Sequence, residues 1–204
     1  MLDPDTELST KKTVGDWLKL EPTLRGASPA VWAEVARDFF RDRLRSLYLD
    51  PINAIRGARA RTGEGFAIVA IQCSLVEFLE SCYQGKNYRR DTPPSATEYN
   101  KSGAMFISFL TKRAPFDARF DEELAKDFYD AVRNGVLHEA RTKRGWRIWA
   151  SSGRDLIVEP AGPILYRDDF QGGLEKFIDQ YCRDLETDPN RQEAFITKFQ
   201  HLSI

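Results

Sequence analysis

The sequence predicts a mainly α-helical fold, with four helices packed as a bundle and followed by a β-hairpin and one or two extra helices. Apolar residues recur every three or four positions over long stretches, which is the spacing of an amphipathic helix. The period changes to two at 146–158, where alternating apolar residues flank a Ser-Gly turn. With 42% apolar residues, the 204-residue chain is long enough to bury the core of such a fold.

The first helix is predicted to begin at Ser28, an N-cap residue followed by proline at the first helical position. Its apolar stripe runs from Trp32 to Tyr48. Asp50-Pro51 is expected to end it, because a proline disfavours helical geometry at the residue before it. Residues 1–27 are polar and weakly patterned, and we expect an N-terminal extension there.

A second helix is expected at 65–84 and a third at 102–113, with a glycine-rich basic loop at 56–65 and a polar loop at 85–100. The first half of the second helix is apolar around most of its circumference. That pattern is typical of a helix enclosed by its neighbours.

A fourth helix is predicted at about 121–142, and its core-facing residues recur every four positions: Leu124, Phe128, Val132 and Val136. After the hairpin we expect a fifth helix, capped by Asp168 or Asp169, and a short amphipathic helix at 188–202. The sequence therefore suggests one domain over 1–204. It would comprise the extension 1–27, a helical core at 28–142, and the hairpin with C-terminal helices at 143–204.

Composition narrows the classes of function. Lys and Arg number 30 and Asp and Glu number 31, so a formal net charge of -1 gives no chain-wide affinity for polyanions. The three cysteines are widely spaced and form no zinc-binding pair. No apolar run approaches the roughly 20 residues that cross a bilayer, and the N-terminus lacks a signal-peptide pattern. We expect a cytoplasmic protein that binds no membrane and uses no metal or cofactor.

The candidate active site lies in the segment FYDAVRNGVLHEARTKRGWRIW, residues 128–149, and comprises Arg133, Asn134 and His138. At about 100° per residue, Arg133 and Asn134 fall well off the core-facing stripe, and His138 lies near its edge. Asn134 and His138 are one turn apart, which makes them neighbours. Leu137 is also left off the core. A second copy of this helix, packed about a twofold axis, would cover Leu137 and join the two polar trios.

These three side chains support RNA cleavage without a metal. An imidazole exchanges protons near neutral pH, and a guanidinium binds phosphate through a fork of N–H donors. His138 would deprotonate the 2′-hydroxyl, which attacks the adjacent phosphorus, while Arg133 stabilises the charge on the phosphate oxygens. Asn134 would orient the imidazole or hold a phosphate oxygen.

Basic and aromatic residues follow His138 closely, and we expect five of them to bind the substrate: Arg141, Lys143, Arg144, Trp146 and Arg147. Basic groups among aromatic rings suit single-stranded RNA, whose unpaired bases stack on the rings. A structural alternative stays open. The cations would then complement the C-terminal end of the helix dipole, and Trp146 and Trp149 would pack the hairpin.

At these residues the sequence resembles the HEPN superfamily, which is marked by Arg, then four to six residues, then His. Here the matching stretch is Arg133-Asn134-Gly135-Val136-Leu137-His138. The pattern often has an Asn directly after the Arg, as Asn134 is here. The resemblance also includes the layout of four main helices with a buried second helix, over residues 29–142. The resemblance implies a HEPN-like four-helix bundle that forms a homodimer around a composite cleft.

The same resemblance implies a metal-independent endoribonuclease that leaves 2′,3′-cyclic phosphate ends, with Arg133 and His138 catalytic and Asn134 in support. Many members act in toxin–antitoxin, phage-defence or RNA-processing systems, so an antitoxin or another regulatory protein is a candidate partner beside RNA.

Two other functions stay open. The same cleft could belong to a non-catalytic helical module that binds RNA, a nucleotide or a partner protein. Alternatively, Arg133 belongs to an intramolecular ion pair, which an acidic neighbour would reveal. Glu77 and Glu80 are acids in the otherwise apolar second helix, and we expect a buried one to pair with an arginine of the first helix.

Overall fold

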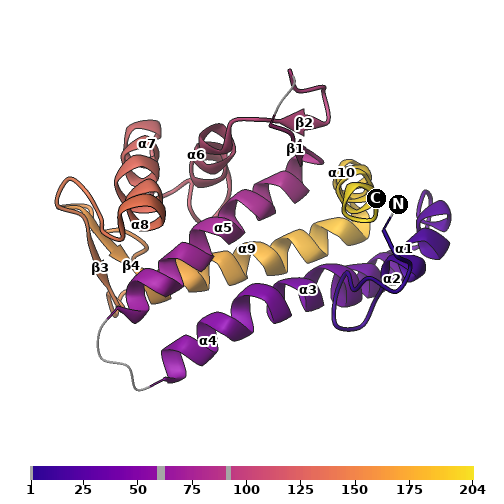
Figure 1. Cartoon of the computed structure of the whole chain (residues 1–204), viewed down its shortest axis with the longest axis horizontal. Coiled ribbons are helices and arrows are strands. Elements are labelled where there is room, and N and C mark those ends of the chain that lie inside the picture. The colour runs from indigo at the N-terminus through magenta and orange to yellow at the C-terminus, as the bar shows by residue number, and fades with distance from the viewer. Residues whose placement is uncertain (1, 59–62, 91–92) are drawn as a thin grey trace. The chain divides into compact units, whose positions relative to one another are not determined.

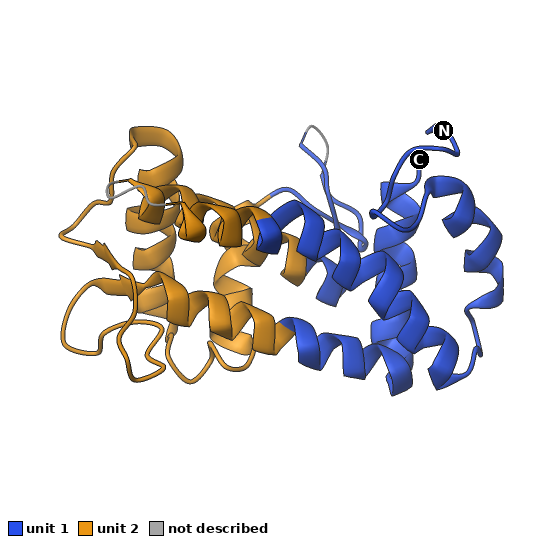
Figure 2. Cartoon of the chain, turned by 90° about the horizontal axis from the view of Figure 1, so that it is seen from below, with its two compact units in different colours: residues 1–50, 81–100, 178–204 blue, residues 51–80, 101–177 orange. Residues whose placement is uncertain are grey.

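The computed structural model describes residues 2–58, 63–90 and 93–204. This part of the chain is mainly helical, as the sequence predicts, and carries two sheets of two strands each (Figure 1). The chain divides into two compact units (Figure 2): unit 1 comprises residues 1–50, 81–100 and 178–204, and unit 2 comprises 51–80 and 101–177. Each unit draws on more than one of the segments 1–27, 28–142 and 143–204.

Unit 1 is held by an aromatic core. Its elements are α1 (Val14–Leu20), a 3-10 turn (Glu21–Thr23), α2 (Pro29–Val35), α3 (Asp42–Leu44), β1 (Asn87–Tyr88), β2 (Glu98–Tyr99), α10 (Pro189–Leu202) and the second part of α9 (Arg167–Thr187). Trp17 of α1 is fully buried, and its ring lies 5.6 Å from Phe39 and 5.4 Å from Phe199. The expected extension 1–27 therefore contains a helix that belongs to the core.

Unit 2 contains the motif. Its elements are most of α4 (Asp50–Gly57) and α5 (Glu64–Gln84), then α6 (Ser102–Lys112), α7 (Glu122–Phe128), α8 (Asn134–Glu139), β3 (Arg147–Trp149), β4 (Ile164–Tyr166) and the first part of α9. Phe128 stacks 5.9 Å from Phe106 and 5.9 Å from Phe170, and Trp146 meets it edge-on at 5.3 Å. These contacts place α7 against α6, α9 and the segment before β3.

The predicted helices at 65–84, 102–113 and 188–202 are confirmed as α5, α6 and α10. By length and composition α5 passes the test for a membrane span, contrary to our expectation from the sequence. In the part of the chain that the structure describes, 56% of its most apolar window is buried, which is typical of the core helix of a soluble protein.

The prediction that Asp50-Pro51 ends the first helix is wrong. Helical structure continues from Pro29 to Gly57, and Pro51 lies in the first turn of α4. A π-helical turn, Arg45–Leu49, directly precedes α4, and Asp50 donates its N–H to the carbonyl of Arg45. The π-helical turn shifts the hydrogen bonding to five residues back just before Pro51, so the proline, which has no N–H, lies where the regular α-helical ladder is already interrupted.

The predicted hairpin at 146–158 is also wrong. β3 pairs in parallel with β4, with Arg147 opposite Ile164 and Trp149 opposite Tyr166. A parallel pair needs a crossover between its strands, and residues 150–163 provide it. Of the loops expected at 56–65 and 85–100, residues 59–62 and 91–92 lie outside the described residues.

Candidate functional site

The motif lies on one helical run that changes its geometry at Arg133. α7 begins after Asp121, whose side chain accepts the N–H of Leu124 at 2.8 Å. A π-helical turn, Tyr129–Arg133, then separates α7 from α8, and such turns are frequent at functional sites. The run ends at Ala140, which has a left-handed φ of 52°, so the helix predicted at 121–142 is slightly shorter than expected.

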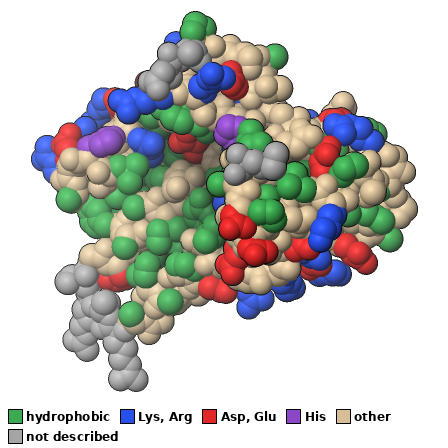
Figure 3. Space-filling view, turned by 45° about the vertical axis from the view of Figure 1, so that its right-hand side comes forward, with side chains coloured by type: hydrophobic (Ala, Val, Ile, Leu, Met, Phe, Trp, Pro, Cys, Tyr) green, Lys and Arg blue, Asp and Glu red, His purple; other side chains and the backbone are tan. Residues whose placement is uncertain are grey.

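The motif residues lie off the core face, as predicted. The buried residues of the run are Ala125, Phe128, Ala131, Val132 and Gly135. His138 is exposed, and the Leu137 side chain before it is 46% exposed. Both histidines of the chain, drawn in purple, reach the surface seen in Figure 3. His138 is therefore not part of the core.

Arg133 is held by neighbours on three sides. Its Nη1 donates to the Asn134 side-chain oxygen at 2.9 Å, its Nη2 lies 3.8 Å from Glu77 Oε2, and its guanidinium lies 5.3 Å from the centre of the Tyr129 ring. Only 19% of the Arg133 side chain is exposed. Glu77 comes from α5, so the motif arginine is fixed by a second helix. This acidic neighbour supports the structural alternative, in which Arg133 belongs to an intramolecular ion pair. The sequence predicts a partner from the first helix for a buried acid of α5, and the partner described for Glu77 is Arg133 of the motif helix.

Asn134 and His138 differ in how they are held. Asn134 donates from Nδ2 to Asp130 Oδ1 at 3.3 Å while its oxygen accepts from Arg133. Within the described ranges, His138 has no side-chain hydrogen bond or ion pair, and none joins it to Arg133. The amide is therefore oriented by its neighbours, and the imidazole is exposed to solvent.

The chain folds back over α8 directly after the motif. The N–H of Arg141 donates to the carbonyl of Gly135, and the N–H of Lys143 donates to the carbonyl of Ala131 at 2.9 Å. A Cβ at Gly135 would overlap the carbonyl oxygen of Arg141. The motif position between Asn134 and Val136 therefore needs a glycine for the close approach of this return segment, residues 140–146.

The return segment is anchored on two acids of the motif helix. Arg144 donates from Nη1 to Asp127 at 2.7 Å and from Nη2 to Asp130 at 3.0 Å, and the Trp146 indole donates to Asp127 at 2.6 Å. Burial raises the pKa of Asp127, but the hydrogen bonds from Trp146 and Arg144 outweigh it and hold that pKa below its usual value.

The five expected substrate-binding residues do not form one free basic surface. Arg141 and Lys143 both pair with Glu139, at 3.3 and 2.7 Å, and Arg144 pairs with two aspartates. Trp146 is only 3% exposed. The stacking role expected for it is therefore wrong, because its faces are taken up by the core.

Arg147 is the exception among the five. It is exposed, and its guanidinium lies 5.4 Å from the centre of the Trp149 ring. Trp149 is 48% exposed, so its ring is available for stacking against a base. The sequence predicts that role for Trp146, three residues earlier.

Glu80, a further acid of α5, is fully buried and pairs with Arg113 at the end of α6. Arg113 donates from Nε and Nη2 to the two carboxylate oxygens, each at 2.9 Å, and the Ser108 hydroxyl donates at 2.7 Å. The partners described for Glu80 thus come from α6 and its C-terminal end, where the sequence predicts an arginine of the first helix.

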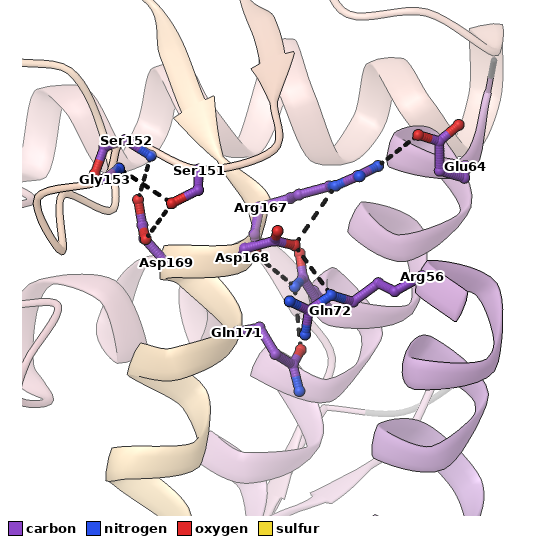
Figure 4. Close-up of polar contacts among 10 residues, drawn as sticks. All are labelled: Arg56, Glu64, Gln72, Ser151, Ser152, Gly153, Arg167, Asp168, Asp169 and Gln171. Atoms are coloured by element: carbon purple, nitrogen blue, oxygen red, sulfur yellow. Dashed lines mark hydrogen bonds and ion pairs between the residues drawn. The ribbon is translucent and has the colours of Figure 1, made fainter. Parts of the chain in front are cut away.

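A second polar cluster surrounds the start of α9 (Figure 4). It joins α4, α5, α9 and a loop through ten residues: Arg56, Glu64, Gln72, Ser151, Ser152, Gly153, Arg167, Asp168, Asp169 and Gln171. Buried Gln72 donates to the carbonyl of Arg167 at 2.8 Å, and Asp168 lies 3.3 Å from Arg56. Because α9 begins at Arg167, neither aspartate is its N-cap, and Asp169 instead accepts the N–H of Ser152 at 2.7 Å. The charges of its two arginines and three acids largely cancel. We therefore interpret the cluster as a structural link between these elements.

Across the described ranges, no group of three His, Cys, Asp or Glu side chains is arranged to hold a metal ion. No protein-family model, curated protein or solved structure matches this chain. The function must therefore be argued from the geometry around Arg133 and His138.

Proposed function

We propose that the chain is a metal-independent endoribonuclease of the HEPN type, with a four-helix core and a site made of Arg133, Asn134 and His138. The observation that carries the proposal is the contrast between these side chains. His138 is exposed and without a partner in the described chain, whereas Asn134 and Arg133, on the same helix, are oriented by hydrogen bonds. A proton acceptor and oriented hydrogen-bond donors are the groups that RNA cleavage requires, and here they lie within two turns of one helix.

His138 acts as the general base that removes the proton of a ribose 2′-hydroxyl. The oxygen attacks the adjacent phosphorus, the bond to the 5′-oxygen breaks, and a 2′,3′-cyclic phosphate remains. The Arg133 guanidinium stabilises the charge on the phosphate oxygens, and the Asn134 amide positions the phosphate. A protonated imidazole returns the proton to the leaving oxygen.

The active form is a homodimer. Leu137 is 46% exposed one residue before His138, and a second copy about a twofold axis covers it while bringing two His138 side chains into one cleft. Leu137→Asp is expected to give a monomer by analytical ultracentrifugation and to abolish cleavage. A monomeric parent at micromolar concentration contradicts the dimer.

By the same resemblance, the protein works in the cytoplasm as a toxin or a phage-defence nuclease, and an antitoxin or regulatory protein controls it. Co-expression with its neighbouring gene product is the direct test, since an antitoxin relieves growth arrest in cells that express the parent.

One observation favours a second function, a non-catalytic module that binds RNA, a nucleotide or a protein. Glu77 and Asn134 already occupy part of the Arg133 guanidinium, which leaves fewer of its donors for a phosphate. In that case binding survives the loss of His138 and no RNA is cleaved.

The deciding experiment incubates the purified full-length protein with cellular RNA, including transfer RNA, in excess chelator. Arg133→Ala and His138→Ala are run beside it, and His201→Ala is the matched control because it removes the other exposed histidine. We expect cyclic phosphate ends from the parent and His201→Ala alone. Cleavage that needs Mg²⁺, or that survives His138→Ala, contradicts the mechanism.

A further inference from the structure

A cavity of about 650 Å³ opens beside α7 in unit 2, away from the motif residues themselves. Its walls combine apolar and charged side chains, among them Arg119, Leu124, Asp127, Arg144, Pro160 and Pro163. Ligand sites in proteins fall in this range of volumes and mix apolar walls with a few placed polar groups. The cavity is therefore large enough for one nucleotide.

A continuous row of polar contacts leads from this cavity to the motif. Arg144, in the cavity wall, bonds to both Asp127 and Asp130, and Asp130 accepts from Asn134. His138 follows Asn134 by one turn of α8. At 1.5 Å per residue, Asp127 and His138 are separated by roughly 16 Å along the helical run. The cavity and the site thus lie on one face, a short distance apart.

The cavity wall carries two acids, Asp127 and Glu159, which pair with Arg144 and Arg154. The charge that the wall offers to a phosphate is therefore that of Arg119. Arg119 is exposed, and no acidic side chain of the described chain pairs with it. The guanidinium of Arg144 is held in place by two carboxylates and keeps N–H groups beyond those it uses. Leu124, Pro160 and Pro163 add apolar surface on which a base can lie. The guanidinium of Arg119 thus matches the phosphate of a nucleotide, and the apolar wall matches its base.

We infer that this cavity is a subsite for single-stranded RNA, which binds one nucleotide a few positions from the bond cleaved at His138. Arg119 binds the phosphate of that nucleotide. The intervening strand passes over Arg144, whose side chain lies on Asp127 and Asp130, and reaches His138. The inference rests on the proposed ribonuclease for the choice of RNA as the ligand. It adds a place where substrate length and sequence are selected.

The test measures binding of a labelled ten-nucleotide single-stranded RNA by fluorescence anisotropy, with full-length His138→Ala protein so that nothing is cleaved. Adding Arg119→Ala is expected to weaken binding about tenfold, the loss of one charge-assisted hydrogen bond. The slope of log affinity against log salt should fall by about 0.7, the contribution of one phosphate contact to a single strand. A dinucleotide, too short to reach the cavity from His138, should bind equally to both proteins.

Arg183→Ala is the matched control, because Arg183 is exposed on α9 outside the cavity and its loss changes the net charge equally. Equal weakening by both substitutions overturns the subsite. So does binding of free adenosine monophosphate as tight as that of the ten-nucleotide RNA, which would make the cavity a site for a small effector.

The two proposals fail separately. Cleavage by the parent with no dependence on Arg119 overturns the subsite and leaves the ribonuclease standing. Arg119-dependent binding of the oligonucleotide with no cleavage by the parent overturns the ribonuclease and leaves the subsite standing.

Discussion

Glu77 Oε2 lies 3.8 Å from Arg133 Nη2, which pairs an acid of α5 with the arginine of the motif. The distance exceeds that of a direct hydrogen bond, and 19% of each side chain is exposed. At this separation the pair lacks the short, charge-assisted hydrogen bond of a strong ion pair. The main effect of the pair is on the charge that Arg133 offers to a phosphate.

Glu77→Gln should therefore tighten RNA binding. Removing the carboxylate frees the Arg133 charge, and the slope of log affinity against log salt should steepen by about 0.7 for the added phosphate contact. Anisotropy with a single-stranded RNA, in the His138→Ala background, measures both quantities. Glu34→Gln, at an exposed position of α2, makes the same change in net charge and should have no such effect. An unchanged slope for Glu77→Gln would show that Arg133 does not contact phosphate.

Gly135→Ala should destabilise the protein by about 1–3 kcal/mol, the usual cost of forcing extra volume into a packed site. The added methyl group meets a backbone oxygen, that of Arg141, which cannot rotate away. Urea unfolding followed by circular dichroism gives the free energy of unfolding. Gly172→Ala is the control, because Gly172 lies in α9 and its added Cβ would have no other atom within 4 Å. This substitution should stabilise the helix by about 0.5–1 kcal/mol. Equal effects of the two substitutions would contradict the close packing of the return segment.

The elements that could be predicted from the sequence are those whose signal is local. The apolar period defines α5, α6 and α10 to within a residue or two, and the motif was expected on the exposed side of its helix. The end of the first helix is predicted wrongly at Pro51, because the effect of a proline depends on the turn before it. That turn is π-helical here, and a π-helical turn has no separate pattern of apolar residues.

The parts that could not be predicted depend on contacts between distant segments. Alternation at 146–158 indicates extended chain but not its partner, and the partner of β3 is the later strand β4. The sequence indicates that Glu77 is an unusual acid in an apolar helix. Its partner Arg133 follows only from the packing of α5 against the motif helix. Asp130 lies four residues before Asn134, so the helical spacing could have suggested that contact.

The anchor of the return segment should be sensitive to acid. The folded pKa of Asp127 is lowered, so its contribution to stability is fully present above the unfolded carboxyl pKa of about 3.9 and is lost as the pH falls through the lower, folded value. Asp127→Asn should remove this part of the pH dependence, and its unfolding free energy should therefore fall less than that of the parent between pH 5 and pH 3. Asp5→Asn, at an exposed N-terminal position, serves as the control. Identical pH profiles for Asp127→Asn and the parent would contradict the role of this carboxylate.

The buried pair of Glu80 and Arg113 allows the sharpest stability test in unit 2. Arg113→Ala removes two hydrogen bonds from a fully buried carboxylate, and breaking a buried pair in this way costs about 3–5 kcal/mol. The double variant Glu80→Leu with Arg113→Met removes both charges and keeps most of the volume, so it should regain much of that loss. Urea unfolding of the two variants and the parent measures the difference. If the double variant is as unstable as Arg113→Ala, the pair itself stabilises the fold, and the cost is not that of a charge left buried.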